Sequence, residues 1–167
     1  MTGAGPAIFS IVAKSNAGKT TLIEGVIPQL RALDLTVGVL KHHHYPGMFD
    51  VPGKDTYRLA EAGADVVVGI GPTQIAVFRP STNEYDLEEA VASHLQDVDV
   101  ALIEGYKRGP YPKIEVHRAA RSDELICEPN ELFALVTDRV WEIGIPQFAL
   151  DDYVGLARLL ADQLTHD

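Results

Sequence analysis

The feature that most constrains how this chain folds is a loop of the phosphate-binding type, residues 13–21, called here the P-loop motif. Its closing tripeptide, Gly18-Lys19-Thr20, is the diagnostic part. The motif follows an apolar run at residues 7–12, typical of a buried strand, and precedes apolar residues at helical spacing over residues 21–33. The order strand, loop, helix predicts an α/β domain that binds a phosphate group.

The chemistry of the motif suits the phosphates of a nucleotide. Successive backbone N–H groups and the positive end of the following helix surround an anion, and Lys19 places a charge near the β and γ oxygens. The hydroxyl of Thr20 is a ligand for Mg²⁺. The residues expected to bind the nucleotide here are Lys14, Ser15, Asn16, Ala17, Gly18, Lys19, Thr20 and Thr21.

Two positions of the motif depart from the simplest pattern or allow two interpretations. Ala13 stands where the usual pattern begins with glycine, and its methyl group removes some backbone freedom. Lys14 either reaches the phosphate of a facing subunit, as in a subgroup of dimeric P-loop NTPases, or is an exposed lysine near an anion. Both interpretations of Lys14 stay open.

Length and composition describe an ordinary globular protein. The 167 residues suffice for one continuous core, and 46% of them are hydrophobic and 23% charged. No apolar run approaches the roughly 20 residues of a transmembrane helix, and the N-terminus lacks the basic start of a signal peptide. We therefore expect a single domain of residues 1–167 in the cytoplasm, with no membrane partner.

The formal net charge narrows the range of partners. Its value of −10 argues against general nucleic-acid binding, because such a surface concentrates Lys and Arg. Phosphate binding must then be local, through backbone amides and a few placed cations. Cys127 is the only cysteine, which excludes an internal disulfide and favours a packed small side chain over a nucleophile.

A polar cluster follows the second predicted strand, residues 35–40, at the end where open α/β sheets face their ligand. Its sequence is Lys41-His42-His43-His44. Because neighbours on an extended chain point to opposite sides, His42 and His44 can share a side and His43 cannot, so a three-histidine zinc site is not expected. Lys41 and His42 are expected to contact nucleotide, metal or a partner subunit; the alternative is a solvated loop.

The middle of the chain predicts a hairpin. Strands at residues 65–70 and 74–78 flank the turn Gly71-Pro72-Thr73 and are expected to extend the sheet edge with antiparallel strands. Further helices are predicted at residues 54–62, 87–95 and 152–164, the last of them capped by Asp151.

An acidic residue ends the next buried strand, residues 98–105. Glu104, beside the P-loop motif, is placed to hold the coordination sphere of Mg²⁺, directly or through water. The expected metal ligands are therefore Thr20 and Glu104, and with Lys19 they form the expected catalytic set. The alternative for Glu104 is a solvated strand end, and Asp99, earlier in the strand, is the weaker acid candidate.

Later positions complete the candidate site. Lys107 or Arg108, which precede a strand at residues 113–118, could neutralise phosphate charge in the same subunit or in a partner; the alternative is a solvated pair. A buried strand at residues 132–136 ends at Thr137-Asp138. The Asp138 carboxylate could accept hydrogen bonds from N1–H and N2–H of guanine, donors that adenine lacks on that edge; the alternative is a helix N-cap.

Several of these stretches together resemble one family, the MobB proteins of molybdopterin-guanine dinucleotide biosynthesis. The lysine–histidine run followed by Pro52-Gly53-Lys54-Asp55 is far more specific than the P-loop motif, which many unrelated families share. Departures are Ala13 and Asn16, where glycines are usual, and the spacing after the histidines. The other matching residues are 15–22, Phe49-Asp50, Arg58, Ala62-Gly63-Ala64-Asp65, Ile103-Glu104-Gly105-Tyr106-Lys107 and Pro112-Lys113-Ile114-Glu115-Val116.

The resemblance implies a cytoplasmic homodimer that binds GTP with Mg²⁺, hydrolyses it slowly, and assists attachment of GMP to molybdopterin. The implied partners are the molybdenum cofactor guanylyltransferase and the molybdopterin cofactor. Two other functions stay open: a small-molecule kinase, which would need an acceptor pocket and an arginine-bearing lid, and a nucleotide-dependent metallochaperone that uses residues 42–44. The expected fold is a P-loop NTPase-type α/β domain with a mostly parallel sheet, helices on both faces and an antiparallel hairpin extension.

Overall fold

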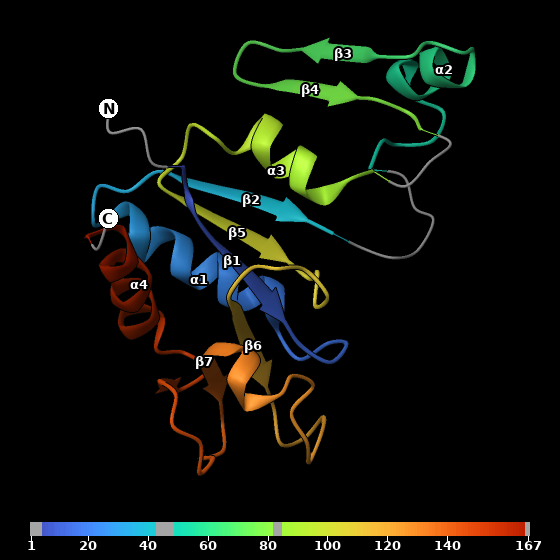
Figure 1. Ribbon diagram of the computed structural model, residues 1–167. Helices are drawn as coiled ribbons and strands as arrows, with labels where there is room; N and C mark the ends of the chain where they lie inside the picture. Colours follow the sequence, from blue (N-terminus) through green and yellow to red (C-terminus); the bar gives the residue numbers. More distant parts are fainter. Residues whose placement is uncertain (1–4, 43–48, 82–84, 166–167) are drawn as a thin grey trace. The chain divides into compact units, whose positions relative to one another are not determined.

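The structure is a computed structural model that describes residues 5–42, 49–81 and 85–165 (Figure 1). The chain divides into two compact units. Residues 1–43 with 90–167 form the sheet unit, which holds a six-stranded sheet, and residues 44–89 form the hairpin unit. Within the described ranges, no helix combines the length and the apolar character needed to cross a bilayer.

The six-stranded sheet is parallel throughout, in the order β2-β5-β1-β6-β7-β8. Because all its strands run the same way, their carboxyl ends lie along one edge of the sheet, where the connecting loops gather. The strands are β1 (Ala7–Val12), β2 (Val37–Lys41), β5 (Val100–Glu104), β6 (Lys113–His117), β7 (Leu132–Thr137) and β8 (Gln147–Phe148).

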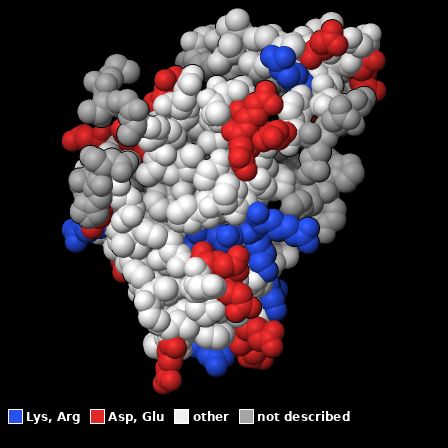
Figure 2. Space-filling model, viewed as in Figure 1, with Lys and Arg blue, Asp and Glu red and all other residues white. Residues whose placement is uncertain are grey.

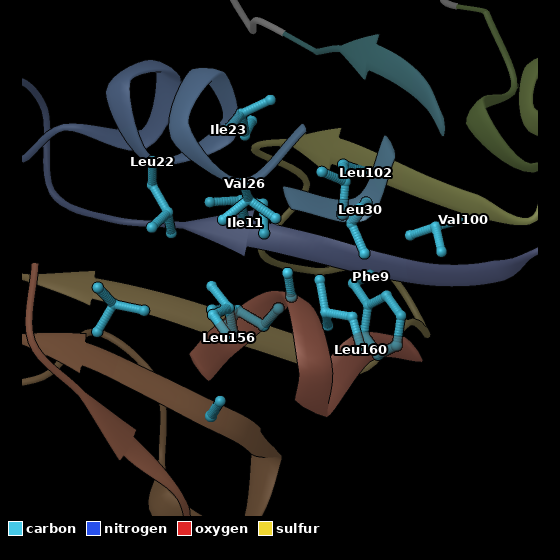
Figure 3. Close-up of a cluster of buried hydrophobic side chains, with 14 of the residues drawn as sticks. Phe9, Ile11, Leu22, Ile23, Val26, Leu30, Val100, Leu102, Leu156 and Leu160 are labelled. Carbon is cyan, nitrogen blue, oxygen red and sulfur yellow. The ribbon is translucent and has the colours of Figure 1, made fainter. Parts of the chain in front are cut away.

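Two helices of the sheet unit, α1 (Lys19–Arg31) and α4 (Tyr153–Asp162), pack side by side over one face of this sheet (Figure 1). Apolar side chains from β1, β5, α1 and α4 meet there, and Figure 3 shows them between the helices and the strands. Ile11, Leu30 and Leu160 are at most 2% exposed. Burial of such side chains stabilises the unit by about 1.5–3 kcal/mol for each one.

The contact between α1 and α4 depends on a glycine. A Cβ atom at Gly25 would lie 2.5 Å from the ring of Tyr153, so the ring lies directly against the α1 backbone. Helix α1 also runs through Pro28 to Arg31, although proline removes one helical hydrogen bond. The close approach at Gly25 holds α4 against the helix that begins at the P-loop motif.

The hairpin unit consists of α2 (Asp55–Glu61) and the antiparallel strands β3 (Val67–Ile70) and β4 (Ile75–Phe78). These strands pair only with each other among the described residues, so the prediction that they extend the edge of the large sheet was wrong. A two-stranded hairpin pairs its backbone only along its inner edges, and packing against a helix, here the contact of β3 with α2, can take the place of a further strand. Val67 is buried, and Gly69 on the same face lies near Thr56 of α2.

The elements for which the sequence analysis gives bounds begin and end within two residues of them, including α3 (Leu87–His94). The cap of α4 is a correction. Asp152, and not Asp151, is the N-cap, because its Oδ1 accepts a hydrogen bond of 2.9 Å from the N–H of Gly155. The mostly parallel sheet with helices and a separate antiparallel hairpin confirms the predicted fold class.

Replacing Gly25 with Ala tests the close approach of α1 and α4. We expect the free energy of unfolding to fall by about 1 kcal/mol, because overpacking against Tyr153 costs ~1–3 kcal/mol and the gain in helix propensity is only about 1 kcal/mol. In a Tyr153→Ala background the same change should instead stabilise the protein. Urea unfolding followed by circular dichroism measures both effects, and a stabilising Gly25→Ala in the otherwise unchanged chain would contradict the packing.

Candidate functional site

The P-loop motif connects β1 to α1 at the carboxyl edge of the sheet, and left-handed backbone at two positions shapes it. Asn16 has φ 58° and Gly18 has φ 107°. Asparagine tolerates this conformation better than most residues, so Asn16 meets a backbone requirement that glycine usually meets. Positive φ outside glycine occurs in the described chain only at Asn16, Asp34 and Tyr106, so Ala13 adopts an ordinary backbone and its methyl group causes no strain.

Three predicted site residues converge beside this motif from three different elements. The Thr20 hydroxyl of α1 donates a hydrogen bond of 3.0 Å to Oε1 of Glu104, at the end of β5. The Nζ of Lys41, at the end of β2, lies 3.6 Å from Oε2 of the same carboxylate, whose side chain is 12% exposed. Each carboxylate oxygen therefore has its own partner, and Thr20, Glu104 and Lys41 lie close together.

The chain turns sharply after Glu104, and this turn places His42 beside it. Gly105 has φ 99°, and a Cβ there would lie 3.0 Å from the carbonyl oxygen of His42. The His42 N–H donates a hydrogen bond of 3.0 Å to the Glu104 carbonyl. The His42 ring packs edge-on against the Tyr106 ring, with 5.6 Å between the ring centroids. His43 and His44 lie outside the described residues, and no group of three or more His, Cys, Asp or Glu able to hold a metal occurs among the described ones.

Asp138 lies in the loop after β7 and does not cap a helix. Its Oδ1 accepts a hydrogen bond of 2.8 Å from the N–H of Ala119, and no helix follows it before β8. The alternative that Asp138 caps a helix was therefore wrong. Its carboxylate instead accepts a hydrogen bond from a backbone N–H just after β6. Thr137 is 8% exposed, and its hydroxyl bonds the backbone of Arg139 and Nδ1 of His117 within the same loop region.

The other predicted site residues occupy different settings. Lys14, Ser15 and Thr21 are exposed, while Lys19 is half-buried. Lys107 is exposed, and its positive charge acts on the carboxylates of Glu115 and Glu131. Its role toward a phosphate remains a prediction.

The position of Asp99 in the sheet unit excludes it as the acid of the expected Mg²⁺ site. It lies before β5, at the opposite end of the strand from Glu104. Hydrogen bonds from the side chain and then the backbone of Thr36 lower the pKa of Asp99. Asp99 therefore ties the beginnings of β2 and β5 together.

A polar face of β6 contains residues to which the sequence analysis assigned no role. Lys113, Glu115 and His117 alternate along the strand and are all buried. The two carboxylate oxygens of Glu115 accept hydrogen bonds from the N–H groups of Ile126 at 2.8 Å and Cys127 at 3.0 Å. Burial raises the pKa of Glu115, and these two N–H groups partly oppose the shift. Three charged or polar residues at a spacing of two are the sequence signal for such a face.

Arg118, directly after β6, is the second residue that was missed. Its Nε donates a hydrogen bond of 2.8 Å to the Ala17 carbonyl, and its Nη2 lies 3.4 Å from the position of a Cβ on Gly18. The guanidinium is thus part of the immediate surroundings of the P-loop motif. On the face shown in Figure 2, the largest group of Lys and Arg side chains lies beside acidic ones, and other basic side chains stand apart from it.

These features define a class. A parallel sheet with the P-loop motif between its strand β1 and helix α1, and an acidic residue at the end of the adjacent β5, is the architecture of P-loop NTPase-type α/β proteins. The model of the family described as molybdopterin guanine dinucleotide synthesis protein B matches residues 8–138. The chain belongs to this MobB family.

Relatives and solved structures agree with this assignment. The molybdopterin-guanine dinucleotide biosynthesis adapter protein of Haemophilus influenzae is 29% identical over 95% of this chain and 90% of its own length. A probable adapter protein of the same name from Bacillus subtilis is 32% identical over 92% of this chain and 91% of its own. The crystal structure of Bacillus subtilis MobB has a TM-score of 0.73 at 28% identity, covering 96% of this chain and 99% of that one.

The thiol of Cys127 should be unreactive in the folded protein. It is 5% exposed against Val12 and Leu132, and burial raises its pKa to about 11, so the nucleophilic thiolate is scarce. We expect negligible labelling by a disulfide reagent at a pH of about 8.5, where an ordinary cysteine is half ionised, and full labelling in urea. Rapid labelling of the native protein would show that this small cluster opens.

Proposed function

We propose that the protein is a cytoplasmic GTP-binding adapter of molybdopterin-guanine dinucleotide biosynthesis, and at most a slow GTPase. The observation that carries the nucleotide part is the hydrogen bond between Thr20 and Glu104 at the end of the P-loop motif. The pathway follows from the names of the adapter proteins to which the chain is similar. Its proposed partners are the molybdenum cofactor guanylyltransferase, which attaches GMP, and the molybdopterin cofactor.

The donor set at this point fits Mg²⁺, which prefers oxygen ligands and keeps several waters. In the proposed site the Thr20 hydroxyl binds the ion, and Glu104 holds it directly or through water. The Thr20 and Glu104 oxygens are 3.0 Å apart, so one small cation or its hydration shell can contact both. Bound Mg²⁺ would bridge the β and γ phosphates and neutralise part of their charge.

The chain's own residues would position the triphosphate without covalent chemistry. Lys19 would sit near the β and γ oxygens, and N–H groups at the start of α1 would donate to the phosphates. Phosphoryl transfer needs mainly positioning and charge neutralisation, which these groups supply.

Asp138 is the proposed guanine reader. Its Oδ1 is oriented by the Ala119 N–H, and a carboxylate oxygen has two acceptor sites, so both oxygens can still accept from guanine N1–H and N2–H. The residue follows β7, which is separated from β1 only by β6. A base bound there would therefore lie across β6 from the phosphates.

A homodimer is the proposed assembly, supported by one face of the hairpin unit. Val68, Ile70, Ile75 and Val77 occupy paired positions on the face opposite Val67 and are 50–80% exposed. An apolar face of two strands, left in water on a protein of net charge −10, is typical of an association surface. A second copy of the chain presents the same face and would cover it symmetrically.

The nucleotide proposal is tested by titrating GTP, ATP and their diphosphates in the presence of Mg²⁺. We expect a preference for GTP in the unchanged protein and strongly weakened binding of all four in Lys19→Ala. Asp138→Ala should weaken GTP by about tenfold to a hundredfold, the loss of hydrogen bonds to a charged group, with little effect on ATP. Isothermal titration calorimetry gives these affinities.

Glu142→Ala is the matched control, because Glu142 is an exposed acid in the same loop as Asp138. It should leave the affinities for GTP and ATP unchanged. Equal binding of GTP and ATP by the unchanged protein would refute Asp138 as a guanine reader.

The dimer is tested by placing a charge on the apolar face. Ile70, which is 80% exposed, is changed to Asp, and we expect the dimer to dissociate because a buried unpaired carboxylate is costly. Val140→Asp is the control, since Val140 is apolar and 89% exposed but belongs to the sheet unit. Sedimentation velocity at micromolar concentration measures the mass; a monomer in the unchanged protein contradicts the proposed assembly.

A further inference from the structure

We propose that Arg118 and Ala119 form a bracket that couples the phosphate-binding and base-reading ends of the nucleotide site, with Arg118 as a positioning residue for guanine selectivity. The inference rests on the proposed GTP site and adds to it the element that sets its internal geometry. The bracket is defined by two contacts made from consecutive residues, one to the P-loop motif and one to Asp138.

The first contact holds the P-loop motif. β1 and β6 are parallel neighbours, with Val12 opposite Glu115, so both chains leave the sheet at the same edge. Arg118 then reaches across to Ala17, and its Nε donates to the Ala17 carbonyl at 2.8 Å. Ala17 is 1% exposed, so little water competes for this carbonyl. A hydrogen bond from a guanidinium is about twice as strong as a neutral one.

The same guanidinium lies beside the residue at which α1 begins. Nη2 would be 3.4 Å from a Cβ on Gly18, the left-handed N-cap of α1. Arginine stays charged at all accessible pH values, and its planar head fixes Nε and Nη2 relative to each other. Arg118 therefore sets both the position of the loop backbone and a constant positive charge next to the proposed triphosphate.

The second contact follows one peptide later. The N–H of Ala119 donates to Oδ1 of Asp138 at 2.8 Å. β6 and β7 are also parallel neighbours, with His117 opposite Thr137, which brings the residues just beyond them together. A shift of the Arg118–Ala119 backbone must therefore move the orientation of the Asp138 carboxylate and the support of the P-loop motif at the same time.

The bracket is itself held in place from behind. The N–H groups of Arg121 and Ser122 donate to the Arg118 carbonyl at 2.8 and 3.1 Å, forming a turn. Nε2 of His117 donates to the Ser122 carbonyl at 2.9 Å, which ties this turn to the buried face of β6. Glu115 secures the later part of the segment through two N–H groups. Because the turn is held on both sides, the backbone of Arg118 has a defined position, so a change there affects both contacts.

The test separates the two ends of the site by using probes that engage one or both. Affinities for GTP, ATP and inorganic tripolyphosphate are measured with Mg²⁺ for the unchanged protein, Arg118→Met and Arg118→Lys. Tripolyphosphate reports the phosphate end alone, and the ratio of GTP to ATP affinity reports the base end. Arg158→Met is the matched control, since Arg158 is an exposed arginine of α4, outside this turn and the P-loop motif.

Arg118→Met should weaken tripolyphosphate by about tenfold and should also lower the GTP-to-ATP ratio by about tenfold. Arg118→Lys keeps the positive charge but loses the planar guanidinium. It should therefore retain the affinity for tripolyphosphate better than it retains the ratio of GTP to ATP affinity. In the Arg118→Met, Asp138→Ala double variant the loss of the ratio should be no greater than in Asp138→Ala alone. Arg158→Met should change none of these values.

Different outcomes overturn different statements. If the unchanged protein has no preference for GTP, the proposed guanine site fails and the bracket fails with it. If that preference is present but Arg118→Met and Arg118→Lys weaken GTP, ATP and tripolyphosphate equally, Arg118 only supports the fold or the phosphates, and the coupling is refuted. Urea unfolding of each variant identifies loss of stability, and Arg118→Lys provides the answer if Arg118→Met does not fold.

Discussion

Parallel pairing of β1 with β5 on one side and β6 on the other is the constraint on which the candidate site depends. The register sets Ile11 opposite Glu104 and Val12 opposite Glu115, so three chain segments leave the sheet together. Those exits supply the P-loop motif, the Glu104 carboxylate and Arg118. In an antiparallel arrangement, one of these exits would lie about 17–20 Å away at the other end of the strand. The site is therefore a consequence of strand direction as much as of residue identity.

The parts of this arrangement that local patterns encode could be predicted from the sequence. Thr20 belongs to a motif with a known geometry, and Glu104 ends an apolar run, so their meeting follows once both strands are assigned to one parallel sheet. Where two residues of the same type are adjacent, the sequence alone does not show which of them has the structural role. Asp152 rather than Asp151 caps α4 because only its side chain reaches the Gly155 N–H. Likewise, the alternation of side chains along β3 and β4 does not show whether this hairpin pairs with the large sheet.

Contacts between distant residues explain what the sequence analysis missed. Arg118 acts on a carbonyl 101 residues earlier, and nothing in the residues around it indicates that partner. Glu115, three residues earlier, did leave a signal in the sequence. Lys113, Glu115 and His117 place a polar side chain at every second position of a strand that is otherwise apolar. A buried carboxylate persists only if hydrogen bonds offset its desolvation, so such a pattern indicates a polar anchor. Here that anchor holds the segment leading from β6 to Cys127.

The net charge of −10 is compatible with the proposed binding of a triphosphate, because repulsion from distant carboxylates and attraction by nearby cations act over different distances. At physiological ionic strength the Debye length is about 8 Å, so carboxylates spread over the surface repel an anion in the site only weakly. Charges within about 4 Å act through a lower effective dielectric constant and are several times stronger. In the proposed site, Lys19 and the Arg118 guanidinium, whose Nε is held 2.8 Å from the Ala17 carbonyl, would act at this short range. The overall charge would then slow the approach of a nucleotide more than it weakens the proposed binding, and the placement of a few cations would decide affinity.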